Sequence, residues 1–292
     1  MGRAAPEGNG HRPAMPGGHR QVTPGMRAIL WVGVVLVFVA GTSLYFLTGH
    51  TDRYFAWTIK VRLSAAFLGA FYYTACVIAL ISVRRREWAR ARVGIPGVTA
   101  FLWLTTLATL LHLDLFHFSS QIGTARVAAW VWLAIYVLDP IALSILWFVQ
   151  VREPGDDAPR TSTLPGAYGA VILIEGIALI VFGVALFVAP AGTGHLWPWA
   201  LTPLTSQMSS AWLVGLGITL ACAAAEADWD RILPATAGLL ALAVFQGLAL
   251  ARYADDISWA TPQARGFVAL LVLNLLLGII GVAAARPRPD PT

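Results

Sequence analysis

Two carboxylic acids, Asp139 and Glu175, lie inside long apolar stretches of the chain. An acid at the centre of a membrane helix costs about 2.5–3.5 kcal/mol to insert, so each of them needs an explanation. Their predicted depths differ by only about 3 Å at 1.5 Å per residue. A short loop, roughly 150–166, makes their helices candidate antiparallel neighbours. We therefore predict that the two carboxyls can meet and share a proton, an arrangement that suits a proton-coupled carrier.

Each acid also has a purely structural interpretation. Asp139 precedes Pro140, and an Asp-Pro pair is a good helix start, with Asp as the N-cap and Pro at the first position. Proline should kink or break the surrounding helix, so Asp139 could cap a half-helix, which is itself a transporter feature. Glu175 has no such local reason, and its alternative is a neutral acid hydrogen-bonded to a neighbouring helix.

A second group of polar residues is predicted at the outer end of the bundle. Its members are His50, Asp52, His112, Asp114, His117, Arg126, His195, Asp255, Asp256 and Arg265. Histidine and aspartate from different loops could bind a metal, but the spacing matches no sharp metal signature. We favour ordinary polar contacts, with Asp114 paired to Arg126 and Asp255 or Asp256 paired to Arg265. Neither a metal nor any other cofactor is predicted.

Two aromatic segments, YFAW at 54–57 and HLWPW at 195–199, are predicted to lie flat on the outer leaflet as anchors. The alternative is an entrance for a lipid or a hydrophobic ligand. The chain contains no Walker loop, dinucleotide glycine motif, HExxH motif or nucleophile elbow. An enzyme is therefore not the favoured prediction.

The composition determines which solvent these residues face. The 292 residues are 58% hydrophobic and only 12% charged, about half the charged share of a soluble domain. A soluble fold of this composition would expose large apolar patches, so a lipid bilayer is the predicted partner. The net charge of +5 could fit nucleic acid, but the basic residues gather at helix ends as orientation signals do. We exclude nucleic acid as a partner.

Eight apolar stretches can each cross a hydrocarbon core about 30 Å thick. They cover about 28–49, 63–83, 94–112, 127–149, 167–189, 205–225, 233–251 and 266–285. The stretches lack the alternation of a β-barrel. The predicted fold class is all-α: a polytopic membrane protein with about eight transmembrane helices.

The basic residues predict the orientation. Fourteen of the twenty Lys and Arg residues fall on the side of both termini, five of them in the segment RRREWARAR at 84–92. This asymmetry predicts both termini in the cytoplasm and a bacterial inner-membrane location. The predicted organisation is a disordered basic tail at 1–26, membrane units at 27–151 and 166–286 joined by a linker at 152–165, and a short tail at 287–292.

The two membrane units resemble each other. At a constant offset of 141, residues 63–64 match 204–205, residues 70–71 match 211–212, and Asp114 matches Asp255. Because four spans preserve orientation, we predict two parallel four-helix repeats. Small residues spaced four apart, such as Ala66 and Ala70, predict close helix packing at the centre of the bundle.

The segments FAW…LSAAFLGAF, LLHLDLFHF and LWPWALTPLT resemble a group of uncharacterised bacterial multipass membrane proteins over about 28–285. The resemblance implies no activity. From the residues, the leading hypothesis is a permease-like or proton-coupled carrier of a small molecule or protons, with a site between the repeats. The alternatives are a non-catalytic membrane subunit or assembly protein that binds a protein partner or lipid, and an outer-face enzyme using the His and Asp cluster.

Overall fold

The computed structural model describes residues 18–285, which form helices and no strands, with only isolated β-bridges. Eight helical spans in this part of the chain are long and apolar enough to cross a membrane. They are α1 (Pro24–Phe46), α3 (Arg62–Arg84), α4 (Trp88–Ala91) continued through η2 (Arg92–Gly94) into α5 (Ile95–Leu111), α6 (Gly123–Val151), α7 (Gly166–Val188), α9 (Pro203–Glu226), α10 (Trp229–Arg252) and α11 (Pro262–Ala284). The prediction of an all-α multipass membrane protein is confirmed.

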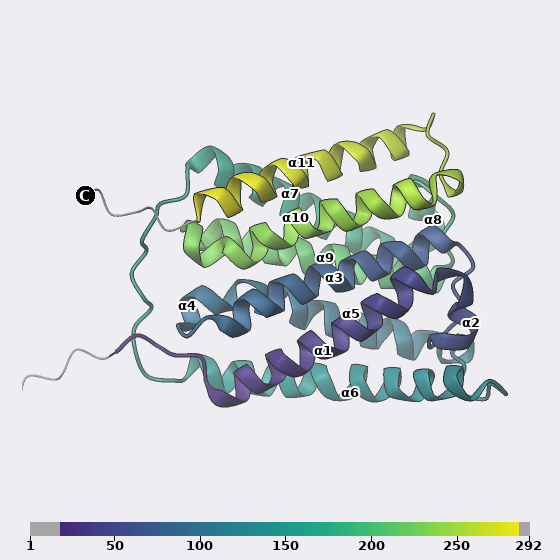
Figure 1. Ribbon diagram of the computed structural model, residues 1–292, viewed down its shortest axis with the longest axis horizontal. Coiled ribbons are helices and arrows are strands. Elements are labelled where there is room, and N and C mark those ends of the chain that lie inside the picture. Colours follow the sequence, from purple (N-terminus) through teal and green to yellow (C-terminus); the bar gives the residue numbers. More distant parts are fainter. Residues whose placement is uncertain (1–17, 286–292) are drawn as a thin grey trace, which may run out of the picture.

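Short helices fill the connections at the end opposite the termini. They are η1 (Thr48–His50), α2 (Thr51–Tyr54), η3 (Leu113–Leu115), α8 (Pro190–Thr193), η4 (Gly194–Leu196) and η5 (Ala254–Asp256). Both ends of the described chain lie at the other end of the bundle (Figure 1). We call these the opposite end and the terminal end.

Three long helices begin at the same local signal, a threonine followed by proline. Thr23, Thr202 and Thr261 each accept a hydrogen bond from the backbone N–H three residues on, and proline occupies the first helical position. The threonine oxygen satisfies a donor that would otherwise be free, and the proline has no N–H to satisfy. These capping signals fix where α1, α9 and α11 start.

The eight spans pack as two layers of four. The main contacts join α1, α3, α10 and α11 in one layer and α6, α5, α9 and α7 in the other (Figure 1). Glycines allow the closest approaches within both layers. Gly97 of α5 lies against Gly215 and Thr219 of α9, and Gly238 of α10 lies against Ile78 of α3. Lipid supplies no hydrophobic force between helices, so such close packing must hold them together.

The outward faces of the peripheral helices are apolar. Large exposed hydrophobic residues include Val39 of α1, Leu138 of α6, Ile174 of α7 and Leu276 of α11. Of the eight spans, α9 is the most buried and α6 the least. Such broad apolar faces are stable only in a bilayer, so the chain is built as an integral membrane protein.

The residues just before α1 are ordered, unlike the tail predicted through residue 26. Val22 N donates to Arg86 O at 2.8 Å, and Trp88 N donates to Arg20 O at 2.9 Å. The buried Gln150 amide of α6 accepts from Thr23 N at 2.7 Å and donates to a nearby backbone carbonyl. The prediction of disorder is wrong for residues 18–26, while residues 1–17 and the predicted tail at 287–292 lie outside the described chain.

The residues just before α7 are held in a similar way. Leu164 N donates to Ala227 O at 3.1 Å, and Trp229 N donates to Ser162 O at 3.0 Å. To reach this position, the connection from α6 crosses the terminal end of the bundle (Figure 1). As a result, α6 and α7 lie on opposite sides of the protein although they are consecutive spans.

The aromatic segments near residues 54–57 and 195–199 are not surface anchors. Trp57 is 2% exposed and its ring lies 4.9 Å from that of Trp132 in α6. Trp199 is 6% exposed and donates from Nε1 to Ser64 Oγ of α3 at 2.9 Å. The Trp57 and Trp199 rings fold inward, where each packs edge-on against another buried aromatic ring.

Candidate functional site

An apolar cavity of about 180 Å³ lies between the two layers. It is bounded by α1, α3, α5 and α6 of the first half of the chain and by α9 of the second. Nearly all of its lining is apolar, and Asp139 of α6 contributes the only carboxyl group among the lining residues. An ionisable group in such surroundings is unusual enough to mark a candidate binding site.

Asp139 is not the cap of a half-helix. Helix α6 continues through Pro140 from Gly123 to Val151, so that prediction is wrong. Pro140 has no N–H to bond the Tyr136 carbonyl, and the Thr106 hydroxyl of α5 donates to that carbonyl instead. The helix survives because a neighbouring helix replaces the missing hydrogen bond.

Aromatic side chains form one wall of the cavity. The hydroxyls of Tyr72 and Tyr136 are 2.5 Å apart, and the Phe101 and Trp212 rings stack at 3.7 Å between centroids. Trp132 packs against Tyr136 at 4.3 Å. The cavity therefore combines one carboxyl group with several aromatic rings, the combination that binds cations in low-dielectric surroundings.

Glu175 lies elsewhere, in the second half of the chain. It is 5% exposed on α7, and its carboxyl neighbours the Asn274 amide of α11. The adjacent Gly176 packs closely against Gly217 of α9. Helices α6 and α7 lie on opposite sides of the bundle (Figure 1), and Asp139 lines the cavity whereas Glu175 does not. The predicted shared proton has no structural basis. The alternative of an acid hydrogen-bonded to a neighbouring helix is not met either, because neither oxygen of the Glu175 carboxyl has a hydrogen-bond partner among the described residues and the Asn274 amide donates to the Leu270 carbonyl.

The predicted outer group is dispersed over the opposite end. His112 Nε2 lies 2.8 Å from Gln207 Oε1, and the ring nitrogens of His117 lie 3.0 Å from Thr58 Oγ1 and from the Phe55 carbonyl. Between residues 18 and 285, no group of three or more His, Cys, Asp or Glu side chains is arranged to hold a metal ion. His112 and His117 thus make separate hydrogen bonds and are not gathered at one site.

The ion pairs predicted for this group are also wrong. Asp256 faces Arg62 at 3.8 Å instead of Arg265, which donates to the Ala260 carbonyl at 2.8 Å. Arg126 donates to the Ser120 carbonyl at 3.3 Å and has no ion pair with Asp114 among the described residues. Asp52 lies 3.8 Å from its neighbour Arg53, and the backbone carbonyl of His195 accepts from Gln263. His50 and Asp255 border a separate pocket beside Asp256.

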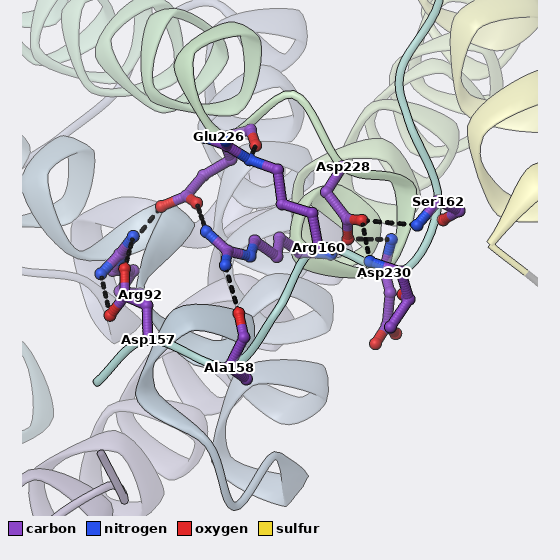
Figure 2. A network of polar contacts seen from close by, with 10 residues as sticks. Arg92, Asp157, Ala158, Arg160, Ser162, Glu226, Asp228 and Asp230 are labelled. Carbon is purple, nitrogen blue, oxygen red and sulfur yellow. Dashed lines mark hydrogen bonds and ion pairs between the residues drawn. The ribbon is translucent and has the colours of Figure 1, made fainter. Parts of the chain in front are cut away.

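Sequence reasoning missed a network of charges at the terminal end. Arg92 Nε donates to Glu226 Oε1 at 2.6 Å, and its terminal nitrogens contact both oxygens of Asp157 (Figure 2). The other Glu226 oxygen accepts from Arg231 Nη1 at 2.8 Å, and Arg160 donates to the Glu226 backbone carbonyl. These contacts join η2, the linker, the end of α9 and the start of α10.

Asp228 organises the turn between α9 and α10. Its Oδ1 accepts from the N–H groups of Asp230 and Arg231, and its Oδ2 accepts from those of Thr161 and Ser162 at 2.7 Å each (Figure 2). An aspartate preceding a helix is a capping signal that sequence reasoning could have used. Its bonds to the linker, over 60 residues away in the chain, have no sequence signal.

The fold and the cavity define an all-helical multipass membrane protein with a small, mostly apolar cavity between its two layers. No protein-family model, curated protein or solved structure matches the chain. The function must therefore be argued from the site itself.

Proposed function

We propose that this protein is a carrier-like membrane protein that binds a small hydrophobic cation in the cavity beside Asp139. The observation that carries the proposal is the single carboxyl of Asp139 in a lining that is otherwise almost wholly apolar and aromatic. A carboxylate and aromatic faces both attract a positive charge. An apolar ligand would leave the polar group of Asp139 without a partner.

The volume of the cavity indicates how large a group it can enclose. An engineered cavity of about 150 Å³ holds benzene, so 180 Å³ fits one ring with a short side chain. Trp212 and Gly215 of α9 also line the cavity, so the second half of the chain contributes to the site. A ligand here would contact both halves.

We also propose that the eight spans form two parallel repeats within 27–151 and 166–286. Contacts in the first unit recur in the second, 141 or 142 residues later. The backbone bond from Val22 to Arg86 corresponds to that from Leu164 to Ala227, and the bond from Trp88 to Arg20 corresponds to that from Trp229 to Ser162. The close approach of Gly97 to Thr219 likewise corresponds to that of Gly238 to Ile78. Each layer would then contain two helices of each repeat. Carriers commonly move one repeat against the other around a site at their interface.

The membrane and the orientation are part of the same proposal. We place the protein in the inner membrane of a bacterium with both termini in the cytoplasm. The excess of arginine at the terminal end supports this, because basic residues are retained on the cytoplasmic side.

A second candidate is a non-catalytic protein that holds an acyl chain or another neutral apolar ligand. The very small polar share of the cavity lining favours it. In this case, Asp139 would contribute little to affinity, and charge on the ligand would not matter. The two candidates differ in whether a cation binds more tightly than a neutral molecule of the same shape.

Binding of benzylamine, which is protonated at neutral pH, tests the proposal against benzyl alcohol and toluene. The full chain is used in nanodiscs, with affinity measured by equilibrium dialysis. We expect benzylamine to bind about tenfold more tightly than benzyl alcohol, the effect of one charge-assisted hydrogen bond. Asp139→Asn should remove this difference. Glu175→Gln is the matched control, because Glu175 is a membrane-embedded acid outside the cavity, and it should leave binding unchanged.

Transport is measured separately, as uptake of labelled benzylamine and of protons into proteoliposomes. We expect uptake by the wild type and loss of uptake in Asp139→Asn. Binding without uptake would reject the carrier and leave a binding protein. Equal affinity for all three molecules in the wild type and in Asp139→Asn would reject the cation site.

A further inference from the structure

A second pocket lies at the opposite end and shares no lining residue with the cavity beside Asp139. It is formed where α1 ends, where α3 begins and where α10 passes into η5. Its charged lining comes from Arg62, Arg252, Asp255 and Asp256. Nothing in the proposed function uses this pocket.

Two guanidinium groups converge on one aromatic ring in this pocket. The Cζ atoms of Arg62 and Arg252 lie 5.5 and 5.1 Å from the centre of the Tyr253 ring. The ring itself is held in place, because Tyr253 is buried and its hydroxyl lies 2.5 Å from Thr48 Oγ1. Both guanidinium groups line the same pocket, so their positive charges add there and favour nearby negative charge.

The protein supplies only part of that negative charge. Asp256 Oδ1 is 3.8 Å from Arg62 Nη2, which is beyond hydrogen-bond distance, and its Oδ2 accepts from Leu63 N. Within residues 18–285, no carboxylate approaches Arg252 to within 4.0 Å, and its one side-chain hydrogen bond goes to the Tyr45 carbonyl. Both guanidinium groups therefore retain free N–H donors in the pocket.

The pocket also has a negative side. Asp255 is exposed and lines the pocket without an ion pair among the described residues. A ligand that carried only negative charge would be repelled by Asp255 and Asp256. A ligand with an anion and an ammonium group would pair with both sides of the pocket.

We propose that this pocket binds a zwitterionic phosphate–ammonium group, with the phosphate between Arg62 and Arg252 and the ammonium at Asp255. Phosphate suits two guanidinium forks because its oxygens accept several N–H donors at once. The pocket lies at the helix ends, the depth at which lipid headgroups lie. Phe46, the last residue of α1, lines the pocket and is 58% exposed, which gives a lipid tail an apolar surface. A free phosphoethanolamine carries the same chemistry.

Native mass spectrometry of the full chain in detergent tests the proposal with phosphatidylethanolamine, phosphatidylglycerol and phosphatidylcholine. We expect the wild type to retain phosphatidylethanolamine about fivefold better than the others, because glycerol has no ammonium and choline has no N–H donor. Arg252→Gln should weaken phosphatidylethanolamine and phosphatidylglycerol alike. Asp255→Asn should remove only the preference for phosphatidylethanolamine.

Arg53→Gln is the matched control, because Arg53 lies at the same end outside the pocket, and it should change nothing. Arg62→Gln is the second variant should Arg252→Gln fail to fold. Free phosphoethanolamine, measured by calorimetry, separates the two sources. If it binds with the same dependence on Arg252 and Asp255 while the lipids show no preference, the ligand is soluble. Equal retention of all lipids in wild type and variants, with no binding of the free compound, would overturn the proposal.

Discussion

Replacing Glu226 by alanine should destabilise the protein by about 3–5 kcal/mol, because it leaves a buried arginine without its counter-charge. The Arg231 side chain is 7% exposed, and its contact with Glu226 Oε2 at 2.8 Å is its only ion pair among the described residues. Arg92 is less affected, since it keeps Asp157 at 2.7 Å. Most of the loss should therefore come from Arg231.

The companion substitutions separate this cause from a general loss of packing. Arg231→Met alone should cost less, about 2 kcal/mol, because Glu226 keeps Arg92 at 2.6 Å. The double variant removes both buried charges, so it should be more stable than the two single losses predict. The coupling energy should lie within about 1–3 kcal/mol.

Equilibrium unfolding in mixed micelles titrated with sodium dodecyl sulfate provides the free energies, followed by circular dichroism. Asp52→Ala is the control, because Asp52 and Arg53 form an exposed pair at 3.8 Å that should contribute at most about 0.5 kcal/mol. A cost of Glu226→Ala no greater than that of the control, or single losses that simply add, would contradict the role of the buried Arg231 charge.

Three other changes have defined outcomes in the same assay. Ala227 has a left-handed backbone (φ 51°), so Ala227→Gly should stabilise by about 0.5–1 kcal/mol, and a loss would contradict this. Burial alone would raise the pKa of Asp157, but Arg92 lowers it overall. The stabilisation by the Asp157 carboxylate is therefore complete above about pH 4 and is lost at lower pH. In Asp157→Asn, the free energy of unfolding should fall less steeply as the pH is lowered below about 4. Gly97→Val should lower the free energy of unfolding by about 1–3 kcal/mol, because the added side chain would push α5 away from α9. Gly247→Ala is the control and should cause no such loss, because no atom lies near the added methyl group.

The apolar stretches were enough to predict the eight spans, because each must satisfy its own backbone in lipid. The observed helices start and end within a few residues of the predicted stretches, and the Thr-Pro caps account for the early starts of α1 and α9. These features are local. They depend on residues adjacent in the chain, which is why sequence reasoning could reach them.

The arrangement of the spans could not be predicted in the same way. Asp139 and Glu175 seemed close because their helices are consecutive, but the linker carries α7 to the far side of the bundle. The bonds from Asp228 to Thr161 and Ser162 fix that course, and they join residues distant in the chain. In lipid, the face of a helix that packs against protein and the face that contacts lipid are both apolar. The sequence pattern therefore does not show which face points inward.

The replacement of one helical hydrogen bond in α6 has a mechanical consequence. At Tyr136 the helix depends on a hydroxyl from α5, so the backbone beside Asp139 is held by its neighbour rather than by its own turn. A ligand that separated the two helices would release that carbonyl and let the second half of α6 swing. Occupancy of the cavity could thus be converted into movement of the second half of α6 while that half stays helical.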